Sequence, residues 1–400
     1  MGLDKFYSFI NNNILFWGLL IGVMFYNYIE SKWNFSYTDE ILALILISFY
    51  LYRAIKEKRI SREFSMFIIV LIVYILYSCF LGITSIAAIM TDVVIQMKPY
   101  IGFYCIYSLP IRVDDYFKSM MRGVCIMCAI FMLFIGLKGA ETIEFYMGHV
   151  SRLATATTIL GFLYFYCSAR TKKNLLIMFL IFSIGVLSFR SKFYGFYTIA
   201  IFIFFFFEKK SKIKLSLKNI IVVMLGFLCV IWAAWEKIYL YLFVGTDSTD
   251  LFARSALYMY APRVLNDYFP LGSGFATYST WASGLYYSPL YYRYHLDNIY
   301  GISPNDISFV ADTFFPVLAQ FGYIGIILFC VFWKKTYNKA KLQLKSNGDV
   351  YSYKIILLII IFFFIESIAD STITNNRGVF MMMLLALFLS ENKKRIYLIK

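Results

Sequence analysis

Arginines and glycines are spaced along one polar stretch of the chain in a pattern that suits an anionic ligand. The segment DLFARSALYMYAPRVLNDYFPLGSGF carries Arg254 and Arg263, followed by Gly272 and Gly274. A guanidinium group donates two parallel hydrogen bonds to phosphate oxygens, and glycine lets the backbone approach a ligand closely. We therefore expect a phosphate site here. The alternative is that each arginine contacts a lipid headgroup or a neighbouring aspartate.

Three further cations end or interrupt apolar runs elsewhere. Arg152 lies in HVSRLATATTILG and Arg190 in LSFRSKFYG, each at the end of a run, whereas Lys98 interrupts the run around DVVIQMKPYIG. A charge within a bilayer is costly and marks a functional candidate, although a lysine can also extend its ammonium group to the surface. Arg152 and Arg190 are expected to form a cationic site below the polar stretch, and both roles stay open for Lys98.

Aromatic residues fill the rest of the polar stretch, with tyrosines at 278, 286, 287, 291, 292, 294 and 300 and a tryptophan at 281. A ring with a polar tip suits the face of a sugar and suits a membrane interface equally well. For any single tyrosine we favour packing or an interfacial position. The cluster as a whole favours glycan contact, with Tyr278 as a candidate.

The composition indicates the elements that position these residues. Hydrophobic residues make up 61% of the chain and charged residues 15%, which excludes a soluble domain. Runs such as 64–82 are long enough to cross a hydrocarbon core of roughly 30 Å, and helices satisfy their backbone polar groups within the span. We predict an all-α, polytopic membrane helical bundle of about twelve transmembrane helices, at 12–29, 39–53, 64–82, 93–110, 119–138, 151–168, 174–189, 193–207, 219–243, 312–333, 355–370 and 376–391.

Basic residues gather in alternate connections between these runs, namely 53–62, 170–173, 209–218, 334–345 and 393–395. Because lysine and arginine are enriched in cytoplasmic loops, both termini are predicted to be cytoplasmic. The chain then forms a single membrane domain, 1–400, and 244–311 is a large external loop between the ninth and tenth spans. The net charge of +15 is therefore a signal of topology and does not indicate nucleic-acid binding.

Short helices are expected inside this loop. A cap at 249–250 begins a helix that runs to Tyr260. Pro262 should bend or end it, and a second helical piece covers 263–268. On one straight helix, arginines nine positions apart would lie on opposite faces, so the break is what allows both to reach one ligand.

Cysteine and histidine usage argues against a metal centre. The seven cysteines lie in or beside apolar runs, and the pair Cys125 and Cys128 has no second pair or histidine nearby, which favours packing. With only His149 and His295 in the chain, a zinc site is not expected. We predict no metal and no cofactor.

The motifs in this region resemble those of the Wzy-type O-antigen and capsular polysaccharide polymerases, within the O-antigen ligase/polymerase superfamily. The likeness rests on Arg254 with Tyr258 four residues later, and on the turn Pro270-Leu-Gly272-Ser-Gly274-Phe275. Arg263 and Gly274 match an R-x10-G pattern, and Ser188-Phe-Arg190 resembles a Ser-Arg element that is here split by Phe189. A further likeness is Asp312-x7-Gln320-Phe-Gly322. The resemblance covers roughly 150–335.

This resemblance implies a metal-independent glycosyltransferase at the outer face of the bacterial cytoplasmic membrane. It would polymerise undecaprenyl-diphosphate-linked oligosaccharides, with membrane lipids and a chain-length regulator protein as further partners. Arginines would bind the diphosphate and stabilise charge on the leaving group. A general base would deprotonate the attacking sugar hydroxyl, and His295, Asp306 and Asp312 all stay open for that role, with helix capping as the alternative for Asp312.

Two other functions remain as alternatives. An O-antigen ligase, which transfers glycan to lipid A-core, usually carries a histidine shortly before the span that follows the insert; here that stretch reads SPNDISFVADTFF. A lipid-linked oligosaccharide flippase also has about twelve spans, but such transporters show internal repeats and broken helices, and neither is evident. The polymerase is the favoured interpretation.

Overall fold

A computed structural model of the protein describes residues 12–58, 60–108, 113–206 and 252–390, together with Trp235 and Tyr239. In these ranges every regular element is a helix, and the one isolated β-bridge pairs Ser303 with Asp306. The prediction of an all-α protein is confirmed for this part of the chain. The predicted span at 219–243 and the predicted cap at 249–250 lie outside the described residues.

The elements before residue 207 are, in order, η1 (Leu20–Met24), α2 (Tyr26–Trp33), α3 (Thr38–Glu57), α4 (Arg62–Leu81), α5 (Ile86–Ser108), α6 (Asp115–Lys138), α7 (Ala140–Met147), α8 (Ser151–Tyr166), α9 (Lys172–Ile184), η2 (Gly185–Ser188) and α10 (Ser191–Phe206). Those from residue 252 are α12 (Ala253–Asp267), α13 (Trp281–Leu285), α14 (Pro289–Arg293), η4 (Phe315–Phe321), α15 (Gly322–Asn347), α16 (Val350–Ala369), η5 (Thr372–Thr374) and α17 (Asn376–Ser390).

Five helical segments in the described ranges are long and apolar enough to cross a membrane: α4, α5, α6, η4 with α15, and α16. The segment 12–24 and α2, bent by 68° at their junction, would make a sixth. Outside this set, α3 has 20 residues and is as long as α4, whereas α8 has 16 residues, which is about 24 Å of helix, and all of them except Arg152 are buried. Five or six potential spans are therefore present in the described residues, and the total of about twelve stays a prediction.

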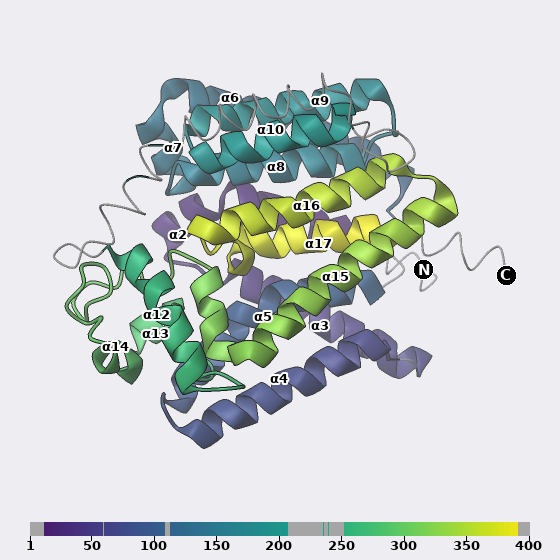
Figure 1. Ribbon diagram of the computed structural model, residues 1–400. Coiled ribbons are helices and arrows are strands. Elements are labelled where there is room, and N and C mark those ends of the chain that lie inside the picture. Colours follow the sequence, from purple (N-terminus) through teal and green to yellow (C-terminus); the bar gives the residue numbers. More distant parts are fainter. Residues whose placement is uncertain are drawn as a thin grey trace.

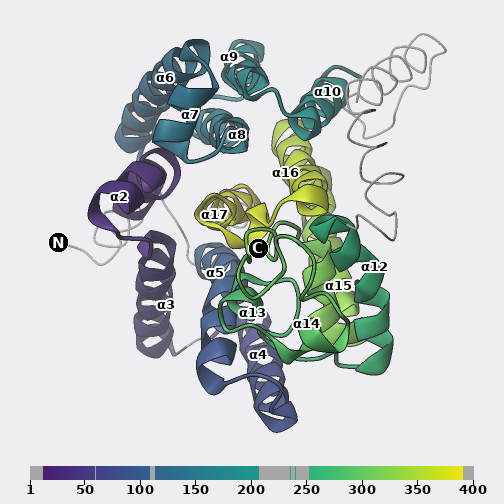
Figure 2. The same ribbon diagram turned by 90° about the vertical axis from the view of Figure 1, so that its left-hand side faces the viewer.

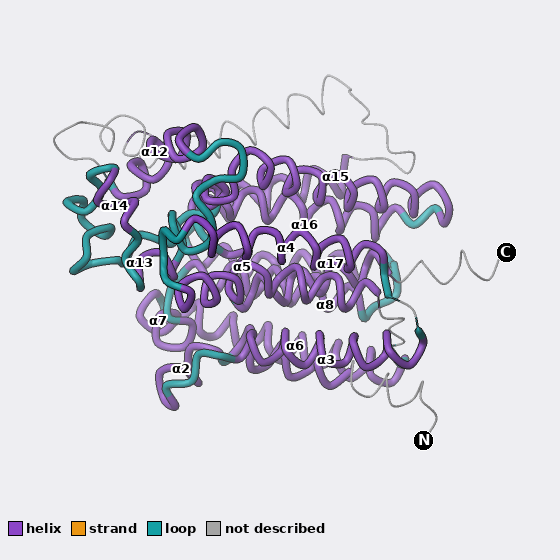
Figure 3. The backbone as a smooth tube through the Cα atoms, turned by 90° about the horizontal axis from the view of Figure 1, so that it is seen from below, coloured by secondary structure: helices purple, strands orange, loops and turns teal. Residues whose placement is uncertain are grey.

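The helices lie roughly parallel, and the two ends of the bundle differ (Figures 1 and 3). The short helices α12, α13 and α14 gather at one end, where α7 also lies. The connections from α3 to α4 and from α15 to α16 lie at the opposite end. In the view along the helices, α5 and α17 lie centrally, α6 to α9 on one side and α4 at the other edge (Figure 2). Burial agrees with this, because every residue from Val379 to Leu389 is at most 1% exposed.

The segment 252–314, which we call the insert, has a small core of its own. Tyr278 and Tyr291 are fully buried there beside Leu257 and Val264. The Tyr278 hydroxyl donates to the carbonyl of Leu257 at 2.7 Å, so the ring is held inside the insert. This segment is therefore a folded unit packed on the end of the bundle.

A buried carboxylate attaches the insert to the bundle. Asp92, in α5, is fully buried and accepts hydrogen bonds from the backbone N–H of Ala276 at 2.7 Å and from Nε2 of Gln320 at 2.9 Å. The N–H of Gly274 donates to the carbonyl of Gln320 at 2.8 Å, and Ser78 Oγ accepts from the N–H of Phe275 at 2.9 Å. The glycine-containing turn is thus docked on α4, α5 and η4.

Gly272 is required where two backbone segments touch. It has a φ of 83°, and a Cβ built on it would lie 2.3 Å from the backbone nitrogen of Gly322. We expect Gly272→Ala to lower the free energy of unfolding by about 1–3 kcal/mol, because either the backbone adopts a strained conformation or the contact opens. A lower thermal unfolding midpoint in detergent would be the measurement. Gly348→Ala, at a φ of 66° with open space around it, is the control for the cost of positive φ alone.

The predicted break at Pro262 is wrong. α12 runs without interruption from Ala253 to Asp267, with Pro262 inside it and exposed. An exposed proline is tolerated in a helix when the freed carbonyl can turn toward solvent. Because the helix is continuous, Arg254 and Arg263 lie about half a turn apart around its axis, and they do not converge.

Candidate functional site

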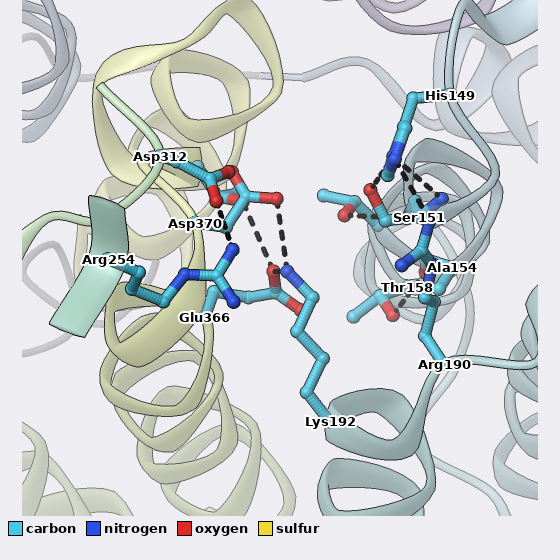
Figure 4. A network of polar contacts seen from close by, with 12 residues as sticks. His149, Ser151, Ala154, Thr158, Arg190, Lys192, Arg254, Asp312, Glu366 and Asp370 are labelled. Carbon is cyan, nitrogen blue, oxygen red and sulfur yellow. Dashed lines mark hydrogen bonds and ion pairs between the residues drawn. The ribbon is translucent and has the colours of Figure 1, made fainter. Parts of the chain in front are cut away.

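Charged side chains from five helices and from the connections beside them meet at the insert end of the bundle, in two groups that face each other (Figure 4). We call Arg254, Asp312, Lys192, Glu366 and Asp370 the acidic group. We call His149, Arg152, Arg190 and Arg377 the basic group. Helix ends position nearly all of them. For example, Phe189 ends η2 with a φ of 50°, and α10 begins two residues later. Arg190 therefore lies just before α10, and Lys192 lies in its first turn.

The acidic group contains more carboxylates than cations. Arg254 forms an ion pair with Asp312. Lys192 Nζ lies 2.6 Å from Glu366 Oε2 and 3.0 Å from Asp370 Oδ2. The three carboxylates and two cations leave one negative charge in excess when all are ionised. Burial is the main cause that raises the pKa of Asp312, and Asp370 adds to the rise while Arg254 opposes it.

The basic group surrounds a neutral histidine. His149 Nε2 lies 2.9 Å from Arg190 Nη2, and Nδ1 lies 2.6 Å from Ser151 Oγ. Because a guanidinium only donates, Nε2 accepts the hydrogen bond from Arg190, and this bond requires an unprotonated Nε2. Burial lowers the pKa of His149, and the charges of Arg190 and Arg152 lower it further. The imidazole is therefore uncharged at neutral pH.

The arginines of this group lack carboxylate partners. Arg152 donates from Nη1 to the carbonyl of Met147 at 3.1 Å. Arg377 is only 2% exposed, and its guanidinium is 3.4 Å from the side-chain oxygens of Asn27 and Asn376. Across the described ranges, no ion pair joins Arg152, Arg190 or Arg377 to a carboxylate. Their positive charge is thus available to an anion at this end of the bundle.

A glycine is also needed beneath Arg152. Gly148 ends α7 with a φ of 72°, and a Cβ there would lie 2.0 Å from Asn27 Nδ2 and 2.8 Å from Arg152 Nη1. α2 packs against α7 here, and Arg152 and Arg377 both contact Met147, the last residue of α7.

Four of the residues singled out in the sequence belong to these groups: Arg152, Arg190, Arg254 and Asp312. Tyr258 lies next to them, since its hydroxyl donates to the carbonyl of Ile368 at 2.8 Å and so links α12 to the end of α16. The structure therefore gathers residues that are up to 160 positions apart in the chain, from Arg152 to Asp312.

The other singled-out residues lie elsewhere. Arg263 is exposed on the opposite face of α12, with its guanidinium 4.8 Å from the centre of the Tyr260 ring. His295 is exposed on the insert, and Asp306 accepts a hydrogen bond from the N–H of Ser308 at 3.1 Å within a turn. Lys98 pairs inside the bundle, with its Nζ 2.5 Å from Asp39 Oδ2 and 2.6 Å from Glu40 Oε1.

Gly272, Gly274 and Tyr278 were expected to contact substrate. In the structure all three pack against other parts of the protein. The two glycines lie in the turn that docks on α4 and α5, and the Tyr278 ring is fully buried inside the insert. None of the three belongs to the acidic or the basic group.

Sequence reasoning missed Lys192, Glu366, Asp370, His149 and Arg377 as site residues. Glu366 and Asp370 could have been found from the sequence. They interrupt the end of the apolar run IIIFFFIESIAD, where charged residues are functional candidates. Lys192 and Arg377 are not among the cations singled out in the sequence. His149 had been weighed only as a zinc ligand, and a hydrogen bond to an arginine 41 positions away leaves no pattern in the sequence.

Within the described ranges, no group of three or more histidine, cysteine, aspartate and glutamate side chains is arranged to hold a metal ion. Cys125 and Cys128 are buried in the core of the bundle.

Comparison with known proteins finds no match: no protein-family model matches the chain, and no curated protein matches it. The resemblance to polysaccharide polymerases therefore depends on the sequence motifs alone.

The contact between Lys192 and Glu366 gives a test of the acidic group. Glu366 is 3% exposed, so removing its partner leaves a buried charge without compensation. We expect Lys192→Ala to destabilise the protein by on the order of 3 kcal/mol, and the double variant Lys192→Met with Glu366→Gln to recover most of that loss. Thermal unfolding in detergent measures both. If the double variant is as unstable as the single one, the ion pair is not the cause.

Proposed function

We propose that the protein polymerises undecaprenyl-diphosphate-linked oligosaccharides into O-antigen or capsular polysaccharide, as a glycosyltransferase at the outer face of the bacterial cytoplasmic membrane. The observation that carries the proposal is the pair of facing groups, one with unpaired arginines and one with excess carboxylate. Arginines would bind a lipid diphosphate, and a carboxylate would deprotonate a sugar hydroxyl.

The orientation proposed with it has both termini in the cytoplasm, about twelve spans and the insert outside. Its support is the alternation of basic connections in the sequence. The arrangement of the bundle is in agreement, because the connections from α3 to α4 and from α15 to α16 lie at the end opposite the insert (Figure 1). The facing groups would then be reached from the outer leaflet.

The donor diphosphate is assigned to the basic group. Among the described residues no carboxylate forms an ion pair with Arg152 or Arg190, whereas Arg254 is already paired with Asp312. Arg377 is buried, and its positive charge would attract the diphosphate without direct contact. Attraction between unlike charges is stronger at such a site than in water, because the surrounding dielectric constant is lower. This revises the expectation that Arg254 and Arg263 bind the diphosphate.

The acceptor hydroxyl is assigned to the acidic group. Its oxygen forms a bond to the anomeric carbon of the donor, and the bond from that carbon to the diphosphate oxygen breaks. The diphosphate leaves with the electron pair, and the arginines stabilise its developing charge. The hydroxyl proton passes to Asp312, whose raised pKa makes it a better base than an ordinary aspartate. Arg254 positions this carboxylate by the ion pair.

The glycan-length pattern of a strain that lacks the protein tests this function. Loss of long chains with single-unit-capped lipid remaining supports the polymerase. Accumulation of lipid-linked units on the inner leaflet would instead identify a flippase. Long lipid-linked polymer together with loss of all surface glycan would identify a ligase.

A further inference from the structure

A lateral groove lies on the side of the bundle away from the charged groups, between α4, α5 and the η4–α15 segment. It encloses about 520 Å³ and is lined mainly by apolar and aromatic side chains, among them Phe67, Leu71, Tyr100, Phe321, Leu328 and Phe332. The proposed transfer reaction uses none of these residues. The groove therefore needs a separate explanation.

Weak packing of α4 creates the groove. Only 17% of its most apolar window is buried, against 61% for α16. Met66, Ile69 and Leu76 are all more than half exposed along α4. Apolar side chains in such numbers are covered by lipid when the protein is in a membrane, so hydrocarbon is the expected filling between α4 and α15.

The two ends of the groove differ in charge. Arg62, Lys335 and Lys339 line one end, together with Glu63. Glu63 pairs with Lys339 at 2.6 Å, and in the described part of the chain no ion pair engages Arg62 or Lys335. At the other end the lining includes Phe275 and Phe321, whose rings pack together with centroids 5.0 Å apart. The groove is thus cationic at one end and apolar at the other.

We propose that this groove binds an anionic glycerophospholipid, with the headgroup phosphate at Arg62 and Lys335 and an acyl chain between α4 and α15. A polyprenyl diphosphate does not suit this groove. The proposed reaction needs its diphosphate at the insert end, with Arg152 and Arg190, whereas the cationic end of the groove is formed by Arg62 and Lys335. The cationic end of the groove is formed by the basic connections, which by the charge rule face the leaflet rich in anionic lipid. The bound lipid stabilises the packing of α4 by mass action.

Native mass spectrometry of the full-length, delipidated protein tests this site. Phosphatidylglycerol, phosphatidylcholine and a polyprenyl phosphate are supplied in turn. We expect phosphatidylglycerol to bind most tightly and to raise the thermal unfolding midpoint. The double variant Arg62→Ala with Lys335→Ala should bind it about tenfold more weakly or worse, because each charge near a membrane surface favours anionic lipid. Lys345→Ala, later on the same helix and outside the lining, is the charge control and should bind normally.

A second variant blocks the apolar part. Leu328, which is 37% exposed, can accept a larger ring, so Leu328→Trp should weaken phosphatidylglycerol binding while the lipid-free protein keeps its unfolding midpoint. Equal binding of phosphatidylcholine and phosphatidylglycerol would overturn the proposal. So would unchanged binding by the double variant, or displacement of phosphatidylglycerol by the polyprenyl phosphate. The glycan-length test of the enzyme is independent of these outcomes.

Discussion

Replacement of Arg190 by alanine is expected to reduce polymerisation by about a hundredfold or more, which is the usual cost of removing one donor that stabilises a developing anion. In the part of the chain that the structure describes, no carboxylate forms an ion pair with Arg190, and its hydrogen bond to His149 at 2.9 Å orients it. The measurement is the rate of chain extension with lipid-linked units and purified protein in liposomes. Arg190→Lys should recover only part of the rate, because an ammonium group lacks the planar fork.

The matched control is Arg263→Ala. Sequence motifs assign the two arginines similar importance, but Arg263 is exposed on the far side of α12 against the Tyr260 ring. We expect this variant to extend chains at close to the normal rate. A normal rate for Arg190→Ala together with a lost rate for Arg263→Ala would contradict the assignment of the diphosphate to the basic group.

Asp312→Asn is expected to lower the rate by about 10²–10⁴-fold, the range for loss of a general base. The base must be deprotonated, so the rate of the unaltered protein should fall as the pH drops through the pKa of Asp312. Because burial raises that pKa, the fall should occur above the pH of about 3.9 at which an ordinary aspartate titrates. A pH–rate profile under single-turnover conditions measures both effects.

Asp306→Asn provides the comparison for this variant, since Asp306 only accepts a hydrogen bond within an insert turn. It should keep the rate and its acid limb. If Asp312→Asn retains full activity, or if the acid limb remains in that variant, another group is the base. Asp312→Glu should retain some activity with a displaced acid limb.

Composition and periodicity were sufficient to predict the helical class, because every apolar run in a membrane must satisfy its own backbone. Composition and periodicity were not sufficient to predict how many helices cross the membrane. α8 has the composition of a membrane helix, yet it is short and buried on all sides by its neighbours. Burial by other helices and burial by lipid favour the same side chains, so the sequence does not separate them.

The motifs predicted part of the site. Arg254 and Asp312 were both singled out, but their ion pair joins residues 58 positions apart and has no local signature. A helix end was predicted at Pro262, but α12 continues through it. The cost of a proline in a helix depends on whether the freed carbonyl is exposed. The turn around Gly272 and Gly274 was expected to contact the ligand. Close backbone contact requires glycine equally when the neighbour is another part of the protein, as Gly322 is here.

The position of Asp92 also constrains how the protein is made. This carboxylate lies in the first third of the apolar helix α5, and its hydrogen-bond donors include backbone and side-chain groups from residues 276 and 320, which are synthesised much later. Until those residues emerge, Asp92 lacks these donors and keeps the contact from Gln96 Nε2 of the same helix at 3.3 Å, and a carboxylate in an apolar helix is unfavourable in a bilayer. We therefore expect a chain that ends before the insert to be degraded faster than the full-length chain.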